Sequence, residues 1–339
     1  MRVFSDHHHQ ALTHSLQLLF EKRLGGQLFN PIGLSWFEQG FWKGASVYGD
    51  NLGTVGQYLD TRGLEPDENG IYQVEGRKGI TLEKFKETEI DIVIASIPEH
   101  LITFNNLIKE YKPKAKLIYQ IGNEFGNYDF SLIKNFMVST APFSVPSHVN
   151  TIFYHQEFDL DIYKPSEEKP KNFIRSFVHC LSQGEGQGSL YRQDWKTFLD
   201  LEDLLPEYQF QAFGASCRDG CINEQSEIAR LMRESKFGFH LKKNGDGFGH
   251  TIFSYFATGK PVIVRKSQYE GKLAGLLMID GVTCIDLDKG TLEESERRIK
   301  AIDDTKYNEM CGNVYKRFKE VVDFEKEFKK IKLFLKKLI

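Results

Sequence analysis

The sequence contains no long apolar segment and almost no excess of charge of either sign. No run of about 18 apolar residues occurs, and the N-terminus passes from MRVFS into the polar Asp-His-His-His, so neither a membrane span nor a secretory signal is expected. The formal net charge of -3 excludes a strong overall field that would recruit nucleic acid. We therefore expect a cytoplasmic protein.

Cysteine is also scarce, and its spacing is irregular. The five residues are Cys180, Cys217, Cys221, Cys284 and Cys311. An odd number at these spacings does not suit a disulfide framework, and the single C-x3-C pair lacks the second pair of a structural zinc site. We expect reduced thiols and no bound metal.

The apolar content, in contrast, is sufficient for more than one core. The chain has 339 residues, of which 40% are hydrophobic and 27 are phenylalanine. A single core rarely extends much beyond about 250 residues, so this length suits two domains. The 27% of charged residues describes a solvated surface, while the hydrophobic and phenylalanine content argues against disorder.

Buried strands alternate with helical patterns along the chain, which is typical of parallel α/β sheets. Amphipathic helices are expected over Gln10–Leu24 and Leu101–Tyr111. The first series of expected strands is Met1–Ser5, Ile90–Ile97, Lys116–Ile121, Phe136–Ser139 and Thr151–Tyr154. The second series is Phe173–Cys180, Gln209–Phe213, Phe237–Leu241, Pro261–Val264, Leu277–Ile279 and Thr283–Asp286. The charged, proline-flanked SEEKPK ending at Lys171 separates the two series and is the best domain boundary.

The C-terminal segment carries one apolar stripe among many lysines. Its apolar residues are spaced three and four apart, as on one face of a helix: Val321, Phe324, Phe328, Ile331, Leu335 and Leu338. Packing on a domain is the usual role of such a stripe. A membrane-surface helix and a homodimer seam are the alternatives.

A glycine-rich turn opens the most informative stretch, Asp246–Val264, which reads DGFGHTIFSYFATGKPVIV. Small residues before a helix let backbone N–H groups and the positive end of the helix dipole meet a diphosphate. Asp246 at the edge of the turn would accept hydrogen bonds from sugar hydroxyls. The alternative is a tight connection between a strand and a helix, since a Gly-x-Gly turn alone is weak evidence.

The longer string resembles the nucleotide-sugar site of glycosyltransferase family 4 and its GT-B relatives, in which E-G-F-G precedes E-A and a G-x-P-V-I strand entry. Phe158-Asp159 and Tyr163-Lys164-Pro165 resemble the segment with which many family members leave their first domain. The resemblance implies an α/β protein of the GT-B class, with two Rossmann-like parallel-sheet domains facing a cleft. It implies an N-terminal acceptor-side domain over 1–165, a nucleotide-sugar domain over 172–315, and a helix over 316–339 that crosses back to the first domain.

The resemblance also implies which residues bind the donor. Asp246 is the expected catalytic carboxylate in the turn. The expected donor-binding residues are Gly184, Gly186, Arg192, Lys196, His240, Lys242, Gly247, Phe248, Gly249, His250 and Ser254. Ser254 departs from the family, because it stands where a second glutamate normally holds the donor ribose. K-x-x-G-D-G-F-G-H also resembles glycosyltransferases encoded by phages and environmental bacteria.

Acceptor contacts are expected from the first domain. His7, His8 and His9 follow the first strand, and three consecutive imidazoles cannot easily face one metal ion. His8 or His9 would orient the acceptor hydroxyl or act as base, with helix capping as the alternative. Trp36 and Trp42 lie in an aromatic, polar loop suited to stacking on a sugar or base, or to covering the domain.

The sequence therefore predicts a metal-independent glycosyltransferase, without a cofactor, that moves a sugar from a nucleoside-diphosphate sugar to an acceptor hydroxyl. Retention of configuration is slightly favoured. The sequence does not decide whether the acceptor is a glycan, a small molecule or modified DNA such as a hydroxymethyl pyrimidine. We expect a monomer or a homodimer. A nucleotide-sugar epimerase and a non-catalytic nucleotide-sugar binding module are the other hypotheses.

Overall fold

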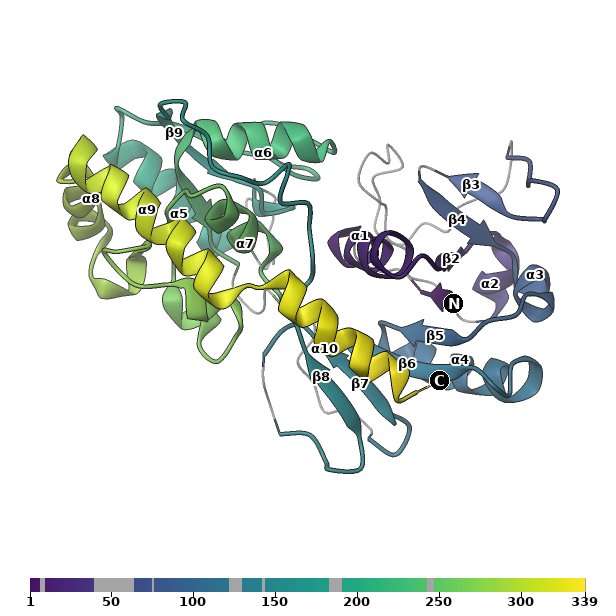
Figure 1. The fold of residues 1–339 in the computed structure, drawn as a ribbon. Coiled ribbons are helices and arrows are strands. Elements are labelled where there is room, and N and C mark those ends of the chain that lie inside the picture. The colour runs from purple at the N-terminus through teal and green to yellow at the C-terminus, as the bar shows by residue number, and fades with distance from the viewer. Residues whose placement is uncertain are drawn as a thin grey trace. The chain divides into compact units, whose positions relative to one another are not determined.

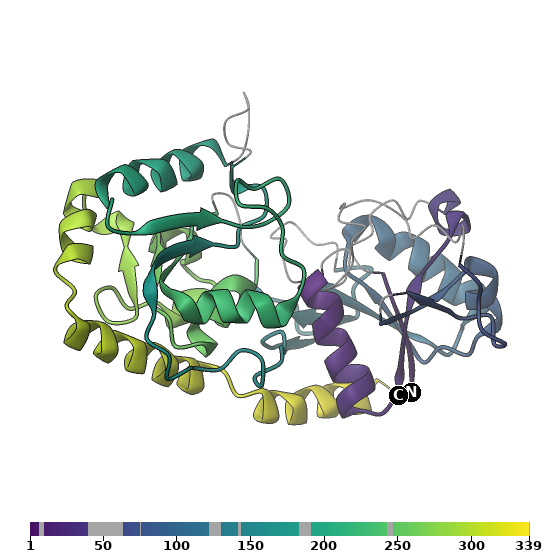
Figure 2. The same ribbon diagram turned by 90° about the horizontal axis from the view of Figure 1, so that it is seen from above.

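The computed structural model describes residues 1–6, 10–39, 64–74, 76–121, 130–141, 144–182, 191–242 and 247–338. The chain divides into two compact units: Met1–Phe158 with Phe324–Ile339, and Asp159–Asp323. The division falls at Phe158, a few residues before the boundary that the sequence suggested. The two termini both belong to unit 1 and lie close together (Figure 2).

Unit 1 is built on an eight-stranded sheet in the order β3-β4-β2-β1-β5-β6-β7-β8 (Figure 1). All neighbours are parallel except β3 and β4. The strands are β1 (Arg2–Ser5), β2 (Gln27–Pro31), β3 (Tyr72–Val74), β4 (Arg77–Ile80), β5 (Ile92–Ala95), β6 (Lys116–Ile121), β7 (Asn135–Val138) and β8 (Asn150–Phe153). The IVIA sequence of β5 is buried throughout, as expected for a central parallel strand that is covered on both faces.

Helices cover both faces of this sheet. One core includes Phe85 of α3 (Leu82–Glu87) and Phe104 of α4 (Pro98–Tyr111). The opposite core includes Leu16 of α1 (Gln10–Gln17), Phe20 of η1 (Leu18–Arg23) and Ile331 of α10 (Phe324–Lys336). A short helix, α2, spans Leu34–Glu38. The last helix of the chain thus completes unit 1 beside β8.

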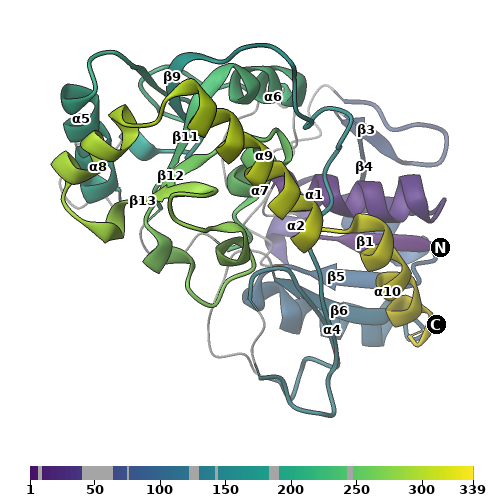
Figure 3. The same cartoon turned by 60° about the vertical axis from the view of Figure 1, so that its left-hand side comes forward.

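Unit 2 has a five-stranded parallel sheet in the order β10-β9-β11-β12-β13 (Figure 3). The strands are β9 (Lys171–Ser176), β10 (Gln209–Ala212), β11 (Ser235–His240), β12 (Val262–Val264) and β13 (Cys284–Asp286). The main helices are α5 (Arg192–Leu204), α6 (Gln225–Glu234), α7 (His250–Ala257), α8 (Leu292–Lys300) and α9 (Asp304–Val321). Three short helices, η3 (Lys266–Tyr269), η4 (Ala274–Leu277) and η5 (Leu287–Lys289), follow β12 and β13.

The strands β2, β3 and β4 were not expected from the sequence, and two expected elements differ in the structure. Leu277–Ile279 is not a strand, because Leu277 ends the helical turn η4 and Ile279 accepts the hydrogen bonds of a turn at Gly281, whose φ is +71°. The single C-terminal helix is two helices, since Val322 is extended at φ -111° and ψ 120°. A β-branched pair followed by aspartate favours this break.

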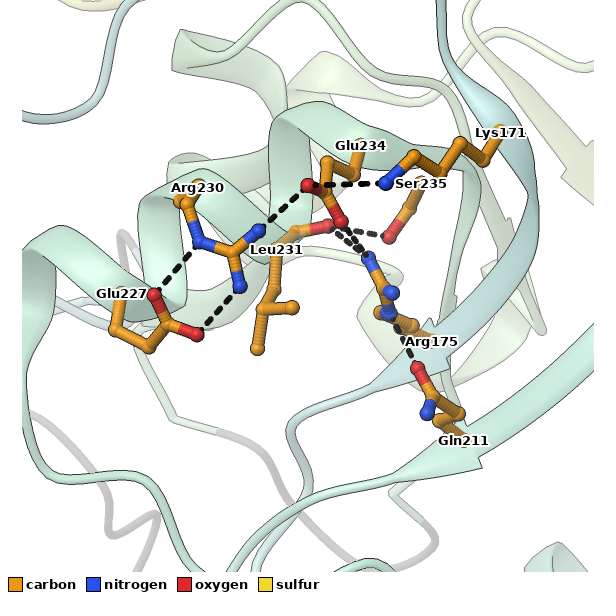
Figure 4. Close-up of polar contacts among 8 residues, drawn as sticks. All are labelled: Lys171, Arg175, Gln211, Glu227, Arg230, Leu231, Glu234 and Ser235. Atoms are coloured by element: carbon orange, nitrogen blue, oxygen red, sulfur yellow. Dashed lines mark hydrogen bonds and ion pairs between the residues drawn. The ribbon is translucent and has the colours of Figure 1, made fainter.

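A buried arginine fastens α6 to the sheet of unit 2 (Figure 4). Arg175 of β9 is 3% exposed, and its Nε donates to Gln211 Oε1 at 2.6 Å. Its Nη1 donates to the carbonyl of Leu231 at 2.8 Å and lies 3.5 Å from Glu234 Oε2. Burial lowers the pKa of this guanidinium. Because a guanidinium stays charged even so, the partners on α6 and β10 compensate its lost hydration.

Candidate functional site

The five strands of unit 2 are parallel, so the loops that follow their carboxyl ends lie along one edge of the sheet. Ligands of open α/β sheets bind at that edge. The loop after β9 carries His179, the loop after β11 carries Lys242, and Gly247–Gly249 lead into α7. Two sequence-distant loops, the one after β9 and the one between β11 and α7, therefore bring polar groups to the same edge.

Gly249 is the turn residue at which α7 begins. Its φ of +81° and ψ of 40° lie in the left-handed region, which a residue with a Cβ adopts at a cost. Its carbonyl accepts from the backbone N–H groups of Ile252 and Phe253, and no side chain of a described residue caps the helix there. The first backbone N–H groups of α7, an eight-residue helix, thus lie next to a residue without a side chain. The positive end of the helix dipole is at the same place. This arrangement suits an anion.

Packing beneath the turn fixes its position. Gly247 and Gly249 are buried, and Phe248 stacks on Phe253 of α7 with ring centroids 4.3 Å apart. The His250 ring lies near Phe248, with centroids 6.4 Å apart, and is nearly perpendicular to the ring of Tyr163, with centroids 6.5 Å apart. Phe248 and His250 therefore hold the turn by aromatic contacts. Asp246, the expected carboxylate, lies outside the described residues.

Lys242 and His240 continue from β11. The backbone N–H of Lys242 donates to Gln268 Oε1 at 3.0 Å, which ties the loop to η3. Desolvation, followed by the positive charge of Lys242, lowers the pKa of His179 on the loop after β9. His240 is buried beside Tyr269, with ring centroids 6.1 Å apart.

Two carboxylates hold η3 in place. Asp286 Oδ1 accepts from the backbone N–H of Lys266 at 3.0 Å, and Asp288 Oδ2 accepts from Ser267 N–H at 2.8 Å. The backbone N–H of Ser267 contributes to lowering the pKa of Asp288, although burial opposes it as the largest single effect. The segment that binds Lys242 is thus fixed to the end of β13.

His179 was not identified from the sequence. Its Nδ1 accepts from the backbone N–H of Ala215 at 3.1 Å, while Ala215 O accepts from Cys180 N–H at 3.0 Å. From the sequence, His179 was placed within an expected strand, Phe173–Cys180, whereas β9 ends at Ser176. A histidine three residues beyond a buried strand was the available signal.

The other expected donor residues have different surroundings. Ser254 is 1% exposed on α7, and its Oγ makes no hydrogen bond with any residue that the structure describes. Lys196 Nζ pairs with Asp200 at 2.5 Å on the exposed face of α5, and Arg192 is the exposed first residue of that helix. Gly184 and Gly186 lie outside the described residues.

Trp36, an expected acceptor contact, belongs to the core of unit 1. It is fully buried, stacks on Phe4 with centroids 4.9 Å apart, and donates its Nε1–H to the carbonyl of Ile80 at 2.8 Å. This correction follows from the indole's size, because α2 needs a large apolar anchor on the sheet. His7, His8, His9 and Trp42 lie outside the described residues.

A buried polar cluster at the carboxyl ends of β1 and β5 was also missed. Asp6 Oδ1 accepts from the backbone N–H of Ser96 at 2.7 Å and from its hydroxyl, and Oδ2 lies 2.8 Å from His100 Nδ1. All three side chains are buried. The cluster fastens the start of α4 to the residue that follows β1.

Among the described ranges, no group of three or more His, Cys, Asp or Glu side chains is arranged to hold a metal ion. All five cysteines are free. No helix in the described part of the chain has the length and apolarity needed to span a membrane.

Comparison with known proteins gives fold-level similarity. No protein-family model matches the chain, and no curated protein matches it. HepE (Alr3699) of Anabaena, solved with UDP and glucose, has a TM-score of 0.63 and 14% identity over 99% of each chain. Sucrose-phosphate synthase of Thermosynechococcus elongatus has a TM-score of 0.64 and 10% identity, covering 99% of this chain and 98% of that chain.

A glycosyltransferase of Rickettsia africae is similar over the same extent, with a TM-score of 0.59, 10% identity, and 99% and 98% of the two chains covered. The similarities span almost the whole length of every chain compared. They confirm the expected GT-B class, with two Rossmann-like parallel-sheet domains.

Proposed function

We propose that this protein is a glycosyltransferase that takes its sugar from a nucleoside-diphosphate sugar. The observation that carries the proposal is the carboxyl edge of unit 2, where the Gly249 turn opens α7 beside the loop of Lys242. HepE, which shares the fold, was solved with UDP and glucose and also with UDP-glucose. The proposal is supported by this turn, which suits a diphosphate, and by a fold that holds a nucleotide sugar in HepE.

The chemistry requires stabilisation of a leaving group. The bond between the sugar's anomeric carbon and the diphosphate oxygen breaks, the acceptor oxygen bonds to that carbon, and the acceptor proton is released. Negative charge grows on the departing nucleoside diphosphate, which the ammonium of Lys242 and the N-terminus of α7 would stabilise. These groups perform the task without a metal, so turnover should survive excess EDTA.

The finer assignments are part of the proposal. Membership of family 4 rests on the Asp246–Val264 string, in which Asp246 would orient the sugar. Retention is proposed because it needs no strong base on the attacking face. The free cysteines agree with a reducing cytoplasm. A glycan or small-molecule acceptor is preferred, since the fold adds nothing in favour of DNA or of a phage-type branch.

A panel of nucleotide sugars tests the proposal through thermal stability. A ligand at 100 times its dissociation constant stabilises the folded state by about 2.7 kcal/mol, which is readily seen as a shift in Tm. We expect a shift with at least one nucleoside-diphosphate sugar and its nucleoside diphosphate, and a smaller shift in Lys242→Ala. Lys316→Ala, which removes a lysine from α9, is the matched control. A panel without any shift would contradict the proposal.

The other two hypotheses predict different products. A transferase consumes the nucleotide sugar and releases the nucleoside diphosphate in proportion to glycosylated acceptor. An epimerase gives an isomerised sugar without an acceptor, and a binding module gives no product. Chromatography of the nucleotide products, with and without candidate acceptors, separates the three.

A further inference from the structure

We propose that His179 binds the phosphates of the donor as an uncharged hydrogen-bond donor through Nε2–H. This inference rests on the proposed function, and it adds a ligand contact that the sequence pattern does not identify. It is carried by the hydrogen bond that the ring makes on its other nitrogen.

That hydrogen bond fixes the tautomer. A backbone N–H only donates, so Nδ1 of His179 must present a lone pair to Ala215 N–H, 3.1 Å away. A ring with a lone pair on Nδ1 is neutral and carries its hydrogen on Nε2. The exposed side chain of His179 is therefore a donor toward any ligand at this edge, and not an acceptor.

The position of the ring suits an anionic ligand. β9 and β11 are neighbouring parallel strands, so the loops that carry His179 and Lys242 leave the sheet side by side. The positive charge of Lys242 also acts on both His179 and Cys180, in agreement with the pairing of β9 and β11. One charged donor and one neutral donor suit oxygens that carry spread negative charge, such as those of a diphosphate.

The loop that holds the ring is locally strained and tightly constrained. Cys180 has a φ of +62°, which is uncommon for a residue with a side chain. A Cβ on Gly214 would lie 2.9 Å from the Cα of His179, so only glycine lets the loop after β10 approach this closely. Such backbone strain persists only where the surroundings impose it. The hydrogen bond from Ala215 N–H orients the ring within this constrained loop.

The electrostatic surroundings agree with a neutral ring. Desolvation, followed by the charge of Lys242, lowers the pKa of His179. Among the residues that the structure describes, the thiols nearest to this loop are Cys180, on the loop itself, and Cys217, whose Sγ lies 3.3 Å from Val178 O, on the loop after β10. Burial raises the pKa of Cys180, which keeps this thiol protonated and uncharged at neutral pH.

Two amide substitutions separate the two nitrogens. In His179→Asn, the amide oxygen replaces Nδ1 and keeps the bond to Ala215, but nothing replaces Nε2–H. In His179→Gln, the amide N–H reaches the place of Nε2, but the acceptor for Ala215 is displaced. His148→Asn, at an exposed histidine of unit 1, is the control. The probes are UDP and inorganic pyrophosphate, titrated by calorimetry into the full chain at pH 7.5.

We expect His179→Asn to lose about tenfold or more in affinity for both probes, the usual effect of removing a hydrogen bond to a charged group. His179→Gln should stay within about threefold of wild type. The reverse order would show that His179 serves only to hold Ala215 and would overturn the inference, as would equal affinity in all variants. Wild-type protein that binds neither of these probes nor any nucleotide sugar would overturn the proposed function as well.

Discussion

Glu327 of α10 accepts two hydrogen bonds from His155, a residue that precedes it by 172 positions. The backbone N–H of His155 donates to Oε2 at 2.9 Å, and its ring Nδ1 lies 2.5 Å from Oε1. The side chain of Glu327 is 14% exposed and that of His155 is 8% exposed. The C-terminal helix is thus joined to the end of β8 by a largely buried charged contact as well as by its apolar stripe.

Glu327→Ala should destabilise unit 1 by about 2 to 3 kcal/mol, because it leaves a buried N–H and imidazole without their acceptor. Glu325→Ala is the matched control on the same helix: Glu325 pairs with Arg23 but is 72% exposed, so its loss should be below about 1 kcal/mol. Urea unfolding followed by tryptophan fluorescence measures both. Equal losses would show that the His155 contact adds nothing to the docking of α10.

Arg175→Met should destabilise unit 2 by about 3 kcal/mol, because Glu234 and the carbonyl of Leu231 would lose a buried partner. Arg230→Met removes an arginine that also pairs with Glu234, but that side chain is 48% exposed. Its cost should be below about 1 kcal/mol. Thermal unfolding of the two variants gives the comparison, and a larger loss for Arg230→Met would contradict the role given to Arg175.

Gly249→Ala should impair both stability and ligand binding. A Cβ in the left-handed region costs about 1 to 2 kcal/mol, and the turn would no longer present its backbone to the diphosphate. Gly281→Ala is the control, since its φ is +71° and nothing lies within 4 Å of an added Cβ. We expect similar losses in Tm, but a loss of about tenfold in nucleoside diphosphate affinity for Gly249→Ala alone. Equal losses of nucleoside diphosphate affinity in the two variants would show that the Gly249 turn is not part of the binding site.

The lowered pKa of His179 determines the direction in which its contribution to folding stability changes with pH. The unfolded chain takes up a proton near the ordinary value of 6.5, whereas the folded chain does so only at lower pH. The unfolded state therefore binds more protons in this window, and stability falls as pH drops below about 6.5 until the folded pKa is passed. His179→Asn should lose less Tm than wild type between pH 7.5 and pH 5. A steeper loss in the variant would contradict this assignment.

The fold was predictable where apolar patterning alone decides it. Strands were expected over Ile90–Ile97 and Pro261–Val264 because these segments are apolar runs, and the structure has β5 and β12 there, buried along their whole length. Leu277–Ile279 is equally apolar, but it forms the end of a helical turn and the start of a glycine turn instead of a strand. Apolar character favours burial and does not by itself select a backbone conformation.

The site was less predictable, because loops and tertiary packing decide it. The Gly249 turn was visible as a glycine pattern before a helix, and the structure gives the left-handed backbone that this pattern requires. Trp36 looked like a surface aromatic, but burial against Phe4 depends on a strand pairing that its own segment does not reveal. The role of His179 depends on Ala215, a contact between two loops that no local pattern encodes.

Hydrogen exchange with the nucleotide sugar that gives the largest thermal shift tests the central claim most directly. We predict that saturating ligand slows exchange at the carboxyl edge of the unit 2 sheet, in 177–182, 240–242, 247–253 and 265–269. The exchange of α8, which begins at Leu292 with its own capping box, should be unchanged. Protection confined to other segments, or no protection by any nucleotide sugar, would contradict the assignment of this edge as the donor site.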